Sequence, residues 1–167
     1  MEQLVLKVNK FEEGLWSFYL LLPEDLSRKY IDQGIKRLMC SINGNEAFHT
    51  GLMPDGKGGW FIMLNKDRMK RYKLTLGDVV GVSIKPDESK YGMPMPEAFE
   101  ELLYQDPEGS KYFESLTPGK KRSLIYIVDK PKSENLKISK AIIILEHLKA
   151  NHGLLDYKVL YEDLKNK

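Results

Sequence analysis

Apolar and polar residues alternate along the first half of the chain in the way that β-strands require. Leu4, Leu6 and Val8 alternate with Lys7 and Asn9, a period of two that is typical of a half-buried strand. Five further strands, several of them rich in aromatic and β-branched residues, are predicted at residues 15–22, 36–42, 46–53, 60–64 and 79–84. Apolar residues recur with helical spacing at residues 24–33 and 65–74, so two helices are predicted between these strands.

The turn at residues 43–45, Asn-Gly-Asn, predicts a hairpin and also its register. A three-residue loop pairs Cys40 with Phe48 and gathers the apolar residues of both strands on one face. His49 then falls on the opposite face together with Arg37, and these two residues form a candidate polar cleft. A tighter turn would instead place Cys40 opposite His49 as a possible reactive dyad. The first register buries more apolar surface, so Cys40 is predicted to be a core residue.

Beyond residue 93 the apolar residues recur with helical spacing. Thr117 before Pro118, Ser133 and Asp156 are predicted to cap helices, and the stretch from 134 to about 150 is predicted to be the central helix. The predicted buried face of this helix consists of Ile138, Ala141, Ile142, Leu145 and Leu148, widened by Ile143 and Ile144. The last helix is predicted to bury Val159, Leu160 and Leu164.

The change of pattern predicts an α+β protein with two parts. A β-barrel-like part covers residues 1–88, a proline-containing connector follows, and a helical part covers residues 93–167. The N-terminus lacks the continuous apolar stretch of a signal peptide, and the longest apolar runs are too short to span a bilayer. The single cysteine fits a reducing compartment. We therefore expect a cytoplasmic protein that does not associate with membranes.

Charge is distributed unevenly although the net charge is only +2. Residues 86–109 hold seven acidic residues against one lysine, and residues 110–150 hold nine basic residues against four acidic ones. Adjacent segments of opposite charge neutralise one another if they pack together, and this is the expected arrangement.

The basic stretch at residues 65–74 is the first candidate binding site. Its cationic side chains could contact the phosphates of a nucleic acid with little sequence preference, or they could form the solvated face of a short helix. A second basic group in the helical part could extend such a surface. The candidate contacts are Lys66, Arg68, Lys70, Arg71, Lys120, Lys121 and Arg122.

Other candidate motifs do not reach the pattern that their chemistry needs. His147 and His152 are five residues apart, whereas metal ligands on one helix need a spacing of three or four. The glycine-rich stretch 54–60 leads into a strand, whereas a phosphate-binding loop leads into a helix. The sequence therefore indicates no catalytic residue, no metal site and no cofactor.

Two longer stretches resemble a known bacterial arrangement. Residues 41–84, SINGNEAFHTGLMPDGKGGWFIMLNKDRMKRYKLTLGDVVGVSI, resemble the domain-of-unknown-function family 1905. Residues 95–128, MPEAFEELLYQDPEGSKYFESLTPGKKRSLIYIV, and residues 137–148, KISKAIIILEHL, resemble the OmpD-associated, bacteriocin-protection-like helical domain. The resemblance implies a small β-barrel of the double-split kind, followed by a small helical subdomain. The longer N-terminal half could close this barrel within one chain.

Three functional hypotheses follow. The first is a non-enzymatic binding, stress-protection or bacteriocin-protection module that contacts an unknown protein or small ligand through its surface. The second is a nucleic-acid-binding protein that uses the basic helix at 65–74. The third is a hydrolase or transferase, for which only the face shared by Arg37 and His49 offers a starting point. We rank the enzyme last, because that face shows no evident nucleophile.

Overall fold

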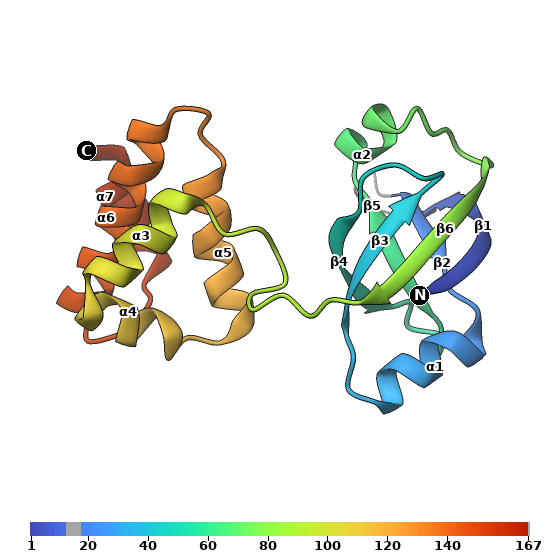
Figure 1. Ribbon diagram of the computed structural model, residues 1–167, viewed down its shortest axis with the longest axis horizontal. Helices are drawn as coiled ribbons and strands as arrows, with labels where there is room; N and C mark the ends of the chain where they lie inside the picture. Colours follow the sequence, from blue (N-terminus) through green and yellow to red (C-terminus); the bar gives the residue numbers. More distant parts are fainter. Residues whose placement is uncertain (13–17, 167) are drawn as a thin grey trace. The chain divides into compact units, whose positions relative to one another are not determined.

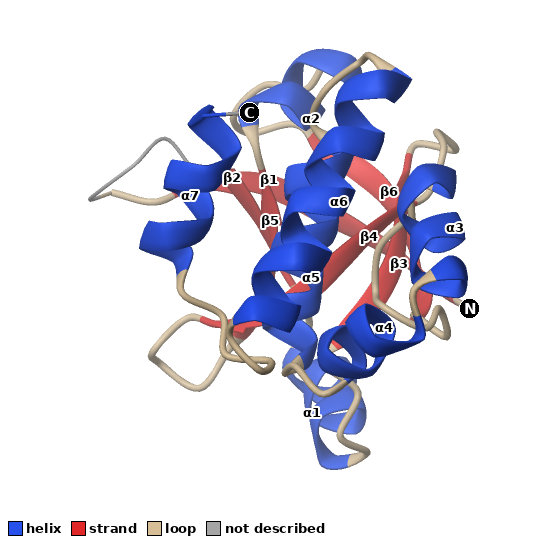
Figure 2. Ribbon diagram, turned by 90° about the vertical axis from the view of Figure 1, so that its left-hand side faces the viewer, coloured by secondary structure: helices blue, strands red, loops and turns tan. Residues whose placement is uncertain are grey.

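The computed structural model describes residues 1–12 and 18–166. The chain forms two compact units, Met1–Gly92 and Met93–Lys167 (Figure 1). All the strands belong to the first unit, and the second is helical, which confirms the α+β prediction (Figure 2).

The first unit is a closed barrel of six antiparallel strands in the order β1-β2-β5-β4-β3-β6. Its strands are β1 Glu2–Lys10, β2 Phe18–Leu21, β3 Arg37–Ile42, β4 Phe48–Pro54, β5 Trp60–Leu64 and β6 Val79–Pro86. β1 pairs with both β2 and β6, so the sheet closes within one chain and leaves no open edge. The predicted strand at 15–22 begins outside the described residues and is described only as β2.

Alternation along the strands builds the barrel core. In β3 every second residue is buried, and the buried residues of β1 and β6 follow the same period. Successive side chains point to opposite faces of a strand, so this period places one row inside and one outside. The predicted hairpin register is confirmed, because Cys40 pairs with Phe48 and Met39 with His49. Cys40 is fully buried, as expected.

Two short helices complete the first unit. α1, Glu24–Asp32, ends before Gly34, which adopts φ 73° as a left-handed terminator. α2, Lys66–Arg71, begins at Asn65, whose side chain accepts a hydrogen bond from the amide of Arg68. Gly77 at φ 90° then turns the chain into β6. Both helices had been predicted from the sequence pattern.

The second unit consists of five helices. They are α3 Glu97–Gln105, α4 Pro107–Glu114, α5 Pro118–Asp129, α6 Glu134–Ala150 and α7 Tyr157–Asn166. Sequence analysis did not predict α4, although its signal is present: Asp106 caps the helix by accepting from the amide of Gly109, and Pro107 occupies its first turn. Thr117 caps α5 as predicted. Ser133 stands at the start of α6, but its side chain makes no capping hydrogen bond.

α6 is the central helix of this unit, because α3, α4, α5 and α7 all contact it. Its buried face differs from the predicted one. Ala141, Leu145 and Leu148 are buried as expected, but Ile138 is 41% exposed and Ile142 is 44% exposed. The observed buried face includes Ile143 and Ile144, as predicted, and also His147, which was not predicted. It consists of Ala141, Ile143, Ile144, Leu145, His147 and Leu148.

At the C-terminal end of the helical unit, one residue predicted to be buried is exposed, and a polar contact joins α6 to α7. In α7, Leu160 is fully buried, but Val159 is 40% exposed, so the prediction for Val159 was wrong. His147 is buried and its Nε2 accepts a hydrogen bond from the amide of Asp156, 3.2 Å away. This contact ties the end of α6 to the start of α7, because Asp156 also caps α7.

Candidate functional site

The outer face of the β3–β4 hairpin brings together the residues of the predicted polar cleft. Arg37 pairs in register with Gly51, and His49 pairs with Met39, so Arg37 and His49 lie diagonally across the two strands. Their neighbours in each strand are buried in the barrel core, which leaves these side chains outside. Both are held by the segment that leaves β6.

Asp87, directly after β6, is the partner of His49. Nδ1 of His49 lies 2.7 Å from Oδ2 of Asp87, whose side chain is 1% exposed. The other carboxylate oxygen accepts hydrogen bonds from the amide and the hydroxyl of Ser89, at 3.0 and 2.6 Å. Burial alone would raise the pKa of Asp87, but the bonds from Ser89 and His49 outweigh it, so that this pKa lies below its usual value.

Arg37 secures the same segment at two further points. Its Nη2 donates to the carbonyl of Gly92 at 2.8 Å, and its own carbonyl accepts from the amide of Asp87 at 3.0 Å. Its guanidinium lies against Gly51, where an added Cβ would be 3.0 Å from Nη1. The polar face therefore fastens residues 87–92 to the barrel. Ser89 donates its hydroxyl hydrogen to Asp87 rather than to His49, so these groups are not arranged as a nucleophile and its base.

The four candidate cations in the basic stretch at 65–74 differ in their burial. Arg68 is half-buried, with its guanidinium carbon 4.0 Å from the centre of the Phe48 ring, and it donates to the carbonyl of His49 at 3.3 Å. Burial lowers the pKa of Arg68. Lys66, Lys70 and Arg71 are exposed. Arg68 thus packs α2 on the hairpin, and the other three remain at the surface.

The second basic group lies at the start of α5, in the other unit. Lys120 is exposed, whereas Lys121 and Arg122 are half-buried. The ammonium group of Lys121 lies 3.0 Å from a carboxylate oxygen of Glu114. Lys121 is therefore already paired within the helical unit.

The remaining candidate chemistry is absent from the described residues. Cys40 and His49 are on opposite faces of the hairpin, and burial raises the pKa of the Cys40 thiol to about 12. Among residues 1–12 and 18–166 there is no group of three His, Cys, Asp or Glu side chains that could hold a metal ion. Within the same ranges, no helix has the length and the apolar character needed to cross a bilayer.

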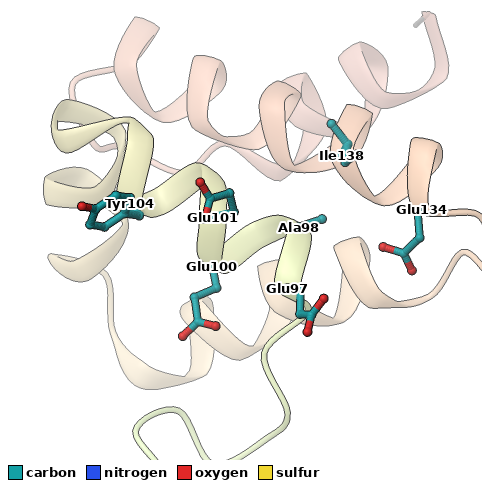
Figure 3. A pocket seen from close by; sticks show the side chains of 7 residues that line it. All are labelled: Glu97, Ala98, Glu100, Glu101, Tyr104, Glu134 and Ile138. Atoms are coloured by element: carbon teal, nitrogen blue, oxygen red, sulfur yellow. The ribbon is translucent and has the colours of Figure 1, made fainter.

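A groove between α3 and α6 was not predicted from the sequence. At its first end, a hollow of about 750 Å³ is lined by residues of α3 from Glu97 to Tyr104 and by the first turns of α6 (Figure 3). Its lining residues are Glu97, Ala98, Glu100, Glu101, Tyr104, Glu134 and Ile138. Figure 3 shows Glu97 and Ala98 on α3, Glu134 on α6, and the Ile138 side chain farther along α6.

The groove continues along the later turns of the same helices. Here a second hollow, of about 610 Å³, is lined by Leu102, Gln105, Asp106, Pro107, Glu108, Ile142, Leu145, Glu146 and Lys149. The starts of both helices line the first hollow, and Asp106, directly after α3, pairs with Lys149 near the end of α6, so α3 and α6 run in the same direction. We call the two hollows together the α3–α6 groove. Its apolar lining consists of Ala98, Leu102, Pro107, Ile138, Ile142 and Leu145, and we call the four that recur at a spacing of four on each helix, Ala98, Leu102, Ile138 and Ile142, its floor.

Carboxylates dominate the rim of this groove. Four line the first hollow and three line the second, against the single ammonium group of Lys149. Lys149 lies 2.9 Å from Asp106 and 2.7 Å from Glu146, and these carboxylates raise its pKa. In the part of the chain that the structure describes, Glu97 and Glu100 have no ion-pair partner.

Residues 86–109 and 110–150 were expected to neutralise one another, but among the described residues few ion pairs join the two segments. Among the described residues 86–109, Asp106 is the carboxylate that pairs with a basic residue of the following segment, through Lys149. The basic residues of α5 and α6 turn instead to acids of their own segment, as in the pairs Lys121–Glu114 and Lys137–Asp129. The acidic face of α3 is left open to a partner. The charge imbalance in the sequence was the signal that could have pointed to this surface.

Comparison with known proteins assigns a family to each unit. Residues 6–84 match the model described as "Domain of unknown function (DUF1905)", and residues 93–151 match "Bacteriocin-protection, YdeI or OmpD-Associated". A search of the curated proteins returned no match to this chain. The first match covers most of the barrel, and the second covers α3 to α6 with the whole α3–α6 groove. The chain therefore joins a domain of the DUF1905 family to a domain of the bacteriocin-protection, YdeI or OmpD-associated family.

Proposed function

We propose that this protein is a non-enzymatic binding protein with a role in bacteriocin protection, and that its helical unit captures a cationic partner in the α3–α6 groove. The family of the helical unit supports the protective role. The proposal includes action in a reducing compartment such as the cytoplasm, which the buried thiol of Cys40 supports.

The observation that carries the proposal is the combination of an apolar floor with an acidic rim. Ile138 and Ile142 are large apolar side chains left about two-fifths exposed in a unit that buries its other α6 isoleucines. Seven carboxylates and one ammonium group surround them. An apolar surface rimmed by charges of one sign favours a partner that carries apolar groups and the opposite charge.

The polar face of the barrel supports binding over catalysis. A general base needs a free ring nitrogen within reach of the group that it deprotonates. Asp87 engages Nδ1 of His49 and leaves Nε2 as the nitrogen that could act as a base, but the nearby hydroxyl of Ser89 is directed to the carboxylate of Asp87 and not to the ring. These contacts favour a structural role for the face, which anchors residues 87–92.

A titration with fluorescently labelled oligolysine tests the capture of cations. We expect binding that weakens at least about tenfold between about 50 mM and 200 mM salt, because exposed charges are screened. The groove variant combines Glu97→Gln, Glu100→Gln and Glu134→Gln. Each exposed charge contributes about 0.5 kcal/mol, so this variant should bind about tenfold more weakly.

The matched control removes two carboxylates of the same unit that lie outside the groove, through Glu162→Gln and Asp163→Asn. It should bind oligolysine almost as tightly as the unmodified protein. Equal losses in the groove variant and the control would show that only net charge matters, and the proposed groove would then be wrong. No binding at low salt would refute the proposed function itself.

Nucleic-acid binding by α2 is the second candidate function, favoured by the exposure of Lys66, Lys70 and Arg71. Labelled duplex and single-stranded DNA of random sequence, titrated at two salt concentrations, test it. The appropriate variant changes these three residues together to alanine and keeps Arg68, which packs on Phe48. Salt-sensitive binding that disappears in this variant would support the second function, and its absence at low salt would exclude it.

A further inference from the structure

The shape and the charge of the α3–α6 groove restrict the kind of partner that can bind in it. Resting on the proposed function, we propose that the groove binds an amphipathic α-helix of a partner protein, about three turns long, with basic residues on both sides of its apolar stripe. Three properties of the groove support this occupant: the spacing of its floor, its length and the placement of its charges.

The floor repeats with the period of a helix. Ala98 and Leu102 are four residues apart on α3, and Ile138 and Ile142 are four residues apart on α6. Residues at this spacing form ridges on a helix surface, and a third helix packs by placing its own side chains between such ridges. Ala98 is small and leaves space beside Ile138, where a large apolar side chain of the partner fits. An extended chain repeats every two residues and would match this floor poorly.

The length of the groove sets the length of the occupant. Along α6 the carboxylates that line it extend from Glu134 in the first hollow to Glu146 in the second. Twelve residues of helix rise about 18 Å, which equals about three turns of a docked helix. Two hollows of this size in sequence are longer than a small cation requires. The groove is thus suited to a helical segment that carries three or four apolar anchors.

Carboxylates stand on both sides of the floor. Glu97 and Glu101 belong to α3, whereas Glu134 and Glu146 belong to α6. A helix in the groove would therefore meet acidic groups on both flanks of its apolar stripe, which favours lysine or arginine at those positions. Tyr104, 84% exposed at the rim, presents an aromatic ring to which such a cation can bind.

Two peptides of equal composition separate the helix from a simple cation. Each has about 14 residues of alanine, leucine and lysine, a length at which a free helix is marginal in water. In the striped peptide the leucines recur every third or fourth residue, and in the scrambled peptide they are spread around the helix. We expect the striped peptide to bind at least about tenfold more tightly and to gain helical circular dichroism on binding.

The floor is tested by Ile138→Ser combined with Ile142→Ser. Because both side chains are partly exposed, the variant should fold, and its unfolding by urea verifies this. It should bind the striped peptide only as tightly as the scrambled one. Val159→Ser is the control, since Val159 is equally exposed, at 40%, on α7 outside the groove. It should leave the affinity for both peptides unchanged.

The outcomes distinguish this inference from the proposed function. If both peptides bind equally and the isoleucine variant changes nothing, the groove captures cations without a helix, and the inference is overturned while the proposed function stands. Binding of the striped peptide without a gain of helicity also overturns the inference, because the occupant is then extended. If neither peptide nor oligolysine binds at low salt, the inference and the proposed function both fail.

Discussion

Replacement of Asp87 by alanine should destabilise the barrel unit strongly. The buried carboxylate accepts three hydrogen bonds, one from His49 and two from Ser89. A hydrogen bond to a charged group contributes about 1.5–3 kcal/mol, but Ser89 is exposed and water replaces it when its partner is lost. The variant loses the full contribution of the bond from His49, and water replaces only part of the contribution of the bonds from Ser89. We therefore expect the free energy of unfolding to fall by about 2–3 kcal/mol.

Urea unfolding followed by tryptophan fluorescence measures this loss in the barrel alone. Both tryptophans of the chain precede the helical unit in the sequence, and Trp60 lies in β5, whereas circular dichroism at about 222 nm reports mainly the helical unit. With a slope of about 1 kcal/mol per molar urea, the fluorescence midpoint should fall by about 2–3 M. The neighbouring variant Glu88→Ala is the control, because Glu88 is exposed. Equal midpoints for Asp87→Ala and Glu88→Ala would refute the reasoning.

The difference in stability between the native protein and Asp87→Ala should also depend on pH. The pKa of Asp87 in the folded state lies below its usual value, because Ser89 and His49 favour the carboxylate over burial. Its contribution to stability is therefore present above the unfolded pKa of about 4 and is lost as the pH falls through the folded pKa. The gap between native and Asp87→Ala midpoints should be constant from about pH 5 to 7 and should narrow below about pH 4. If the gap between the two midpoints stays constant at low pH, the loss of stability in Asp87→Ala is due to lost packing and not to the charge of the carboxylate.

Three further predictions test other parts of the fold. The buried thiol of Cys40, with a pKa of about 12, should not react with a disulfide reagent at about pH 8 until the barrel is unfolded. Gly77→Ala should lower the fluorescence-detected stability by about 1 kcal/mol, since Gly77 has φ 90°. Phe113→Ala should lower the stability of the helical unit by about 3–5 kcal/mol by circular dichroism, because Phe113 is fully buried against Phe99, and should leave the fluorescence midpoint unchanged.

Local signals in the sequence were sufficient to predict most of the strands and helices. The alternation of β1 and β3, the hairpin turn at residues 43–45 and the cap at Thr117 all depend on residues within a few positions of one another. Such signals act through backbone geometry and neighbouring side chains, so they can be read without a partner. The capping pair Asp106-Pro107 was equally local, and α4 was missed because its apolar pattern is short.

The candidate sites depended on contacts between distant residues. His49 and Asp87 are 38 positions apart, and the sequence offered Asp87 only as one acid in a charged run. The internal role of Arg68 likewise depends on Phe48, which only the barrel brings beneath α2. A pairing between two charged or polar groups depends on distance and burial, and neither is encoded in local spacing.

By itself, then, the sequence determined the strands, most helices, the hairpin register and the division into a β part and a helical part. Tertiary structure decided which side of α6 is buried. Apolar residues surround most of that helix, so its pattern allows several buried faces, and the positions of α3, α4, α5 and α7 select one of them. Ile138 and Ile142 fall outside the selected face and remain about two-fifths exposed. The α3–α6 groove exists for that reason.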